Sequence, residues 1–150
     1  MTETDSKTPE ALRLVKRYML GSLAVGVVPM PVLDMAVLTG VQLKMLHGLA
    51  ALYDVPFSSR SGRSVIASLV GGGIPITLTS VLPVGQLIRT AGMSVFAGAS
   101  TYAIGRVFMQ DFESGGEFLT LKPEKIKRFY DEKFDQGKQE VRQSFAGVQP

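Results

Sequence analysis

The chain has 150 residues, of which 45% are hydrophobic and 19% are charged, with a net charge of +3 and no cysteine. The small net charge and the lack of any run that interleaves Lys or Arg with aromatics give no support to a nucleic-acid-binding groove. The absence of cysteine excludes disulfides, thiolate metal sites and cysteine nucleophiles. This length predicts one domain, with room for a separate tail.

Charge is distributed unevenly along the chain. Residues 60–110 carry four Arg and no acid, whereas residues 111–150 carry eight acids and seven bases. We therefore expect a helical membrane-associated domain over residues 1–110 and a charged C-terminal loop and amphipathic helix over residues 111–150.

The first predicted hairpin begins at Thr8-Pro9, where Thr is a suitable N-cap and Pro a suitable first helical residue. This helix ends before Pro29-Met30-Pro31, and a second helix is predicted over Val32–Tyr53. The apolar piece Tyr18–Val28 spans roughly 16 Å, too short to cross a bilayer. The second helix carries a partial polar stripe near its end, formed by Lys44, His47, Ala51 and Asp54.

The second predicted hairpin follows a loop at Asp54–Gly62. Within Ser64–Gly105 the only charged side chain is Arg89, and the uncharged run Ser64–Ile88 is long enough to enter a bilayer. We expect helices over Ser64–Leu82 and Val84–Met109, joined by a Pro/Gly turn at Leu82–Gly85.

Small residues recur at helical spacing in the fourth helix. Rows of this kind let helix backbones approach closely, either within lipid or within a helical core. We expect the row to pack helices and to mediate homo-oligomer formation; its residues are Ser94, Ala97, Gly98, Thr101 and Gly105.

The C-terminal segment begins with a loop around Gly115-Gly116 and continues as a helix from Pro123. One side of that helix is apolar and the other is densely charged, which predicts an amphipathic helix that covers a surface. Its expected partner-binding residues are Ile126, Phe129, Tyr130, Phe134 and Val141.

Both predicted hairpin turns are uncharged, whereas the outer ends of the hairpins carry basic residues. This pattern favours insertion in a bacterial inner membrane with the basic ends and both termini in the cytoplasm. The alternative is a soluble protein in which both hairpins form one four-helix core and Arg89 pairs with Asp34.

The sequence contains no nucleophile–base pair and no cluster of metal ligands, and His47 is the only histidine. We therefore expect no enzyme activity, no cofactor and no metal. Isolated polar residues within apolar segments are costly and define a candidate intramembrane polar path. They are Asp34, Gln42, Lys44 and Arg89.

Two stretches resemble the bacterial YcjF-like family, a domain of unknown function. The first contains Pro29-x-Pro31, Asp34, Gln42, Met45, Leu49 and Tyr53; the second contains Thr101-Tyr102-Ala103-x-Gly105 and the Gly-Gly loop. The resemblance covers most of residues 12–135. It implies a helical, membrane-associated protein with no assigned activity, often linked to a GTPase, which for this chain would act in trans.

These observations predict a membrane-associated, self-assembling helical scaffold or adaptor that recruits a cytoplasmic partner, such as a GTPase, through its C-terminal helix. Two other functions stay open. One is an oligomeric membrane pore or transport component lined by the isolated polar residues, and the other is a soluble helical adaptor.

Overall fold

The computed structural model describes residues 3–24, 31–70 and 86–146, and these residues form helices and no strand. The helices are α1 (Glu3–Ser22), α2 (Pro31–Tyr53), α3 (Ser59–Val70), α5 (Gln86–Glu113), the short 3-10 helix η3 (Phe118–Thr120) and α6 (Pro123–Ala146). The predicted all-α fold class is therefore confirmed.

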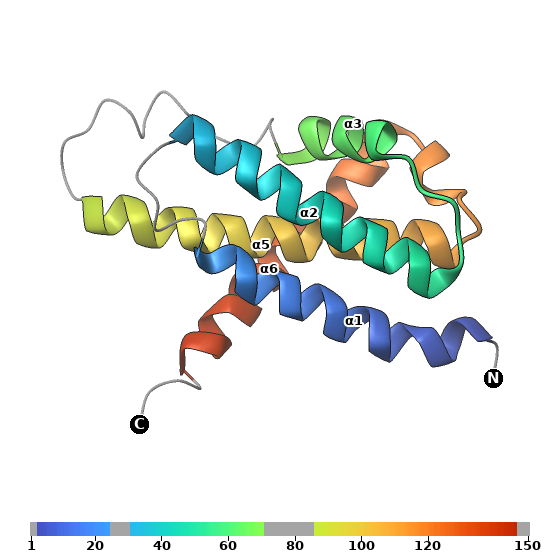
Figure 1. Cartoon of the computed structure of the whole chain (residues 1–150), viewed down its shortest axis with the longest axis horizontal. Coiled ribbons are helices and arrows are strands. Elements are labelled where there is room, and N and C mark those ends of the chain that lie inside the picture. Colours follow the sequence, from blue (N-terminus) through green and yellow to red (C-terminus); the bar gives the residue numbers. More distant parts are fainter. Residues whose placement is uncertain (1–2, 25–30, 71–85, 147–150) are drawn as a thin grey trace.

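Helix α5 is the central element of the fold. Helices α1, α2 and α6 all pack against it, and α3 packs against α2 (Figure 1). Helices α1 and α2 are antiparallel neighbours, because Leu14 of α1 contacts Gly48 of α2 while Thr8 and Tyr53 bind the same carboxylate further along. One hydrophobic cluster contains buried side chains from α1, α2, α3, α5 and α6.

Small residues allow this close packing around α5. A Cβ added to Gly105 would lie 2.6 Å from Val15 Cγ2 of α1, and a Cβ on Gly98 would lie 2.8 Å from Val141 Cγ2 of α6. A glycine of α6 also packs closely on α5, because Gly137 lies directly on the backbone of Ala99. The small residues of α5 therefore pack helices of the same chain.

Aromatic rings fill the end of the core where α2, α3 and α5 meet. Phe108 lies 6.0 Å from Phe57 and 5.9 Å from Phe112, and Phe112 lies 5.9 Å from Tyr53, measured between ring centroids. Such separations fall in the attractive range for aromatic pairs. The loop after α2 is thereby fastened to α5 through Phe57.

A carboxylate on α5 ties three helices together at this end. Glu113 Oε1 accepts hydrogen bonds from the Tyr53 hydroxyl at 2.6 Å and from the Thr8 hydroxyl at 2.9 Å. Burial, followed by the hydrogen bond and the charge of Glu113, raises the pKa of Tyr53 above its usual value. The neutral phenol is therefore the form that the fold selects.

The predicted Gly-Gly loop between α5 and α6 is present. Gly115 and Gly116 have φ values of 73° and 85°, a left-handed conformation that favours glycine. The Asp111 side chain closes the loop, because its Oδ1 accepts the Leu119 backbone N–H at 2.9 Å.

Several predicted boundaries differ from the structure. Helix α1 begins at Glu3, so Pro9 lies inside the helix and Thr8 is not its N-cap. The hydroxyl of Thr8 instead reaches Glu113, and the early acidic residues suit the positive end of a helix dipole. Helix α3 begins at Ser59, inside the predicted loop, since the Ser58 carbonyl already accepts the Gly62 N–H.

The predicted turns stay predictions, because Leu82–Gly85 lies outside the described residues and Val28–Val32 lies mostly outside them. In the described ranges, no helix combines the length and the apolar character that crossing a membrane requires. The predicted division after residue 110 falls within α5, which continues to Glu113. Helix α6 packs on α5 and buries Tyr130 and Val141, so it shares the common core.

We predict that Gly137→Ala lowers the free energy of unfolding by about 1–3 kcal/mol, because its Cβ would lie 3.0 Å from Cα and O of Ala99, which are backbone atoms. A matched control is Gly92→Ala in α5, where the new Cβ meets nothing within 4 Å and should stabilise the helix by about 0.5–1 kcal/mol. Urea unfolding of both variants measures the difference. Equal effects of the two substitutions would contradict the close α5–α6 contact.

Candidate interaction surfaces

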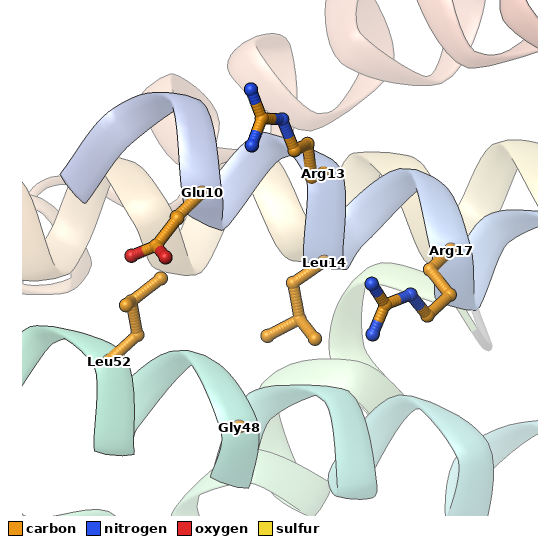
Figure 2. Close-up of a pocket in the computed structure, with 6 residues that line it drawn as sticks. All are labelled: Glu10, Arg13, Leu14, Arg17, Gly48 and Leu52. Carbon is orange, nitrogen blue, oxygen red and sulfur yellow. The ribbon is translucent and has the colours of Figure 1, made fainter. Parts of the chain in front are cut away.

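An open groove lies between α1 and α2, with a volume of about 360 Å³. Glu10, Leu14 and Arg17 of α1 point across the groove towards α2, where Gly48 and Leu52 form the opposite wall (Figure 2). Arg13 also lines the groove, with its side chain directed away from α2. Along α1 the groove thus has an acidic end at Glu10 and a basic end at Arg17, with Arg13 and Leu14 between them.

Helical geometry explains this arrangement. Ala11, Val15 and Met19 are buried against the core, so residues on the opposite side of α1 face outwards. A Cβ on Gly48 would lie 3.1 Å from Leu14 Cδ2, so the missing side chain lets Leu14 pack against α2. Within the described part of the chain, neither Glu10 nor Arg17 takes part in an ion pair.

Helix α3 presents a second surface. Its inner face buries Gly62, Ile66 and Leu69, whereas Arg60 and Arg63 are exposed at its first turns. The sequence contains no acidic residue between Asp54 and Asp111 that could neutralise them locally. The exposed side of α3 is therefore basic, and the uncharged run of the sequence begins within this helix.

A third surface is an apolar pocket of about 450 Å³ between α3 and the start of α6. Val65 and Leu69 line it from α3, and Ile126 lines it from α6. Leu121, 43% exposed, forms part of its rim.

A buried polar cluster joins α1, α2 and α5. The Gln42 side-chain amide donates to Ser100 Oγ at 3.2 Å and to Thr101 Oγ1 at 3.1 Å. Ser22 donates to the Tyr18 carbonyl, so the 2.8 Å contact between Ser22 and Thr101 must use the Thr101 proton. All four side chains of the cluster are fully buried, and Gln42 Oε1 has no partner among the described residues.

The predicted intramembrane polar residues do not form one path in the described structure. Gln42 lies in the core, whereas Lys44 is exposed on another side of α2. The side chains of Asp34 and Arg89 lie outside what the structure describes, so their predicted pairing stays a prediction. Lys44, His47, Ala51 and Asp54 are all exposed, as the polar stripe predicted.

The predicted oligomer residues lie inside the chain. Gly98, Thr101 and Gly105 contact α1, α2 or α6, Ala97 packs on Leu38, and Ser94 donates to the Leu23 carbonyl at 2.9 Å. All five residues are therefore occupied by helix packing within the chain. A surface for a second copy has to be built from other residues.

The predicted partner-binding residues of α6 also pack within the chain. Tyr130 and Val141 are buried, and Ile126, Phe129 and Phe134 are partly buried against the core. The charged side of α6 is the side left for a partner. On it, burial and the nearby charge of Arg106 lower the pKa of Lys133 from its usual value.

The described residues include no group of three or more His, Asp or Glu side chains that could hold a metal ion.

His47 Nε2 lies 2.9 Å from Ser59 Oγ, and its ring stands edge-on to the ring of Phe57, with 4.8 Å between the ring centroids. These contacts give His47 a structural role at the start of α3. The groove lined by Glu10 and Arg17 was not predicted from the sequence, although these two charged residues are seven positions apart on the side of α1 away from the buried Val15.

We predict that Gln42→Met leaves the free energy of unfolding unchanged or raises it by about 1 kcal/mol, because it removes an unpaired buried carbonyl. Thr101→Val should lower it by about 1–3 kcal/mol, since both Gln42 and Ser22 would lose a partner. Urea denaturation compares the two variants. A loss for Gln42→Met equal to that for Thr101→Val would contradict an unpaired Oε1.

Comparisons with known proteins show the family to which the chain belongs. The family described as a domain of unknown function (DUF697) matches residues 4–139. Magnetosome membrane protein 22 of Magnetospirillum gryphiswaldense is 39% identical over 137 residues, which cover 85% of this chain and 70% of that protein. No solved structure matches the chain. The resemblance noted from the sequence is thus confirmed, and the chain belongs to the family of DUF697 domains.

Proposed function

We propose that this protein is a non-catalytic, self-assembling helical scaffold held at the bacterial inner membrane, which recruits a cytoplasmic partner. The observation that carries the proposal is the position of Arg60 and Arg63 on the exposed side of α3, at the start of a 25-residue uncharged run. Cations at this position suit anionic lipid headgroups, and the uncharged run suits the apolar phase. The name of the magnetosome membrane relative supports attachment to a membrane.

The scaffold role follows from what the described surfaces offer. They carry grooves and charged helix faces, which suit contacts with other molecules. In this proposal α6 is a rigid part of the fold whose outward side meets the partner. The family resemblance implies a GTPase acting in trans as the class of that partner.

The membrane part is tested by flotation with vesicles that contain a third of anionic phospholipid. At about 1 kcal/mol for each cation near the surface, Arg60→Gln with Arg63→Gln should weaken binding by roughly 2 kcal/mol. Arg128→Gln with Arg142→Gln on α6 changes the net charge equally and should leave binding nearly unchanged. If both pairs weaken binding equally, general charge and not α3 is responsible; a wild-type chain that does not float contradicts membrane attachment.

The partner part is tested by capture on the intact chain, because removing α6 would expose the core. Reversal of exposed charges on α6, with Arg128→Glu and Arg142→Glu, should abolish retention of a partner whose binding differs between GTP and GDP. Arg60→Gln with Arg63→Gln is the control and should retain it. Undiminished, nucleotide-dependent capture by the α6 variant would show that the partner binds elsewhere.

A further inference from the structure

The groove between α1 and α2 has a charge pattern that is complementary to itself. Glu10 lies at one end and Arg17 at the other, separated by two helical turns or about 10 Å along α1. Because α1 and α2 are antiparallel, Asp54 at the end of α2 lies towards the acidic end, and Lys44, one turn before Gly48, lies towards the basic end. Both residues are exposed.

A groove of this kind fits a second copy of itself better than it fits a partner of uniform charge. In a two-fold symmetric interface, residue i of one copy meets residue j of the other, and j meets i. Rotation about an axis near Leu14 brings the acidic end of one copy to the basic end of its partner. Both pairs of charges are then satisfied at once.

The shape of the surface supports the same occupant. In this arrangement the α1 ridge of one copy lies in the groove of the other, whose volume is about 360 Å³. Val37, 46% exposed, and Val41 lie on the same side of α2 as Gly48 and extend the apolar wall. Two helices about 30 Å long and 10 Å wide offer roughly 600 Å² on each copy, which is the size of a modest specific interface.

We infer that the α1–α2 face is a two-fold dimer interface in which Glu10 of each copy pairs with Arg17 of the other. The inference rests on the self-assembly included in the proposed function, and it names the surface through which two copies assemble. It places assembly on a face of the chain that the predicted small-residue row does not occupy. The lipid-facing side of α3 is not needed for it.

The test is a charge exchange measured by sedimentation of the full-length chain in density-matched non-ionic detergent. Glu10→Arg and Arg17→Glu should each weaken dimerisation at least about tenfold, because each places like charges opposite one another twice. A mixture of the two single variants should dimerise again, since the introduced arginine of one chain then faces the introduced glutamate of the other. The double variant should dimerise alone.

Lys122→Glu is the control, because Lys122 is exposed between η3 and α6, does not line the groove, and its reversal changes the net charge equally, so dimerisation should stay unchanged. If both single variants dimerise as strongly as the wild type, the proposed interface is wrong, although the protein still self-assembles. A wild-type chain that stays monomeric overturns the surface and self-assembly together. Failure of the mixed variants to associate overturns the reciprocal pairing.

Discussion

The close approach of helices to α5 is the constraint on which the rest of the structure depends. Gly98 and Gly105 let α1 and α6 settle against α5, and Gly137 lets α6 reach the backbone of Ala99. Apolar contacts at this separation bring large buried areas together and supply the main stabilisation. Because α5 is covered by α1, α2 and α6, the surfaces left for other molecules lie on the outer helices.

The buried polar cluster sits within this apolar packing. Gln42, Thr101 and Ser22 link α2, α5 and α1 by hydrogen bonds that an apolar core would lack. Their partners are specific in position, so the cluster favours one register of the three helices over sliding alternatives. The unpaired Oε1 of Gln42 means that this specificity comes with some loss of stability.

The outer helices expose surfaces that differ in their charge and in the molecules that they suit. Helix α3 turns its arginines outwards beside an uncharged run, which suits an anionic lipid surface. Helices α1 and α2 form a groove with opposite charges at its two ends. Helix α6 packs its aromatic side against the core and exposes a side that carries both positive and negative charges. Lipid, a second copy and a partner protein therefore have separate faces in the proposed arrangement.

The sequence by itself determined the helical class, the span of α2, the Gly-Gly turn and the start of α6, because hydrophobic periodicity, glycine and proline act locally. The family was also recognisable from residues in fixed order. Only the tertiary structure decided which surface each amphipathic helix covers. The small residues of α5 and the aromatic side of α6 suit an intermolecular contact equally well on a helical wheel. Packing within the chain buries them first, because neighbouring helices of one chain meet at a far higher effective concentration than separate copies do.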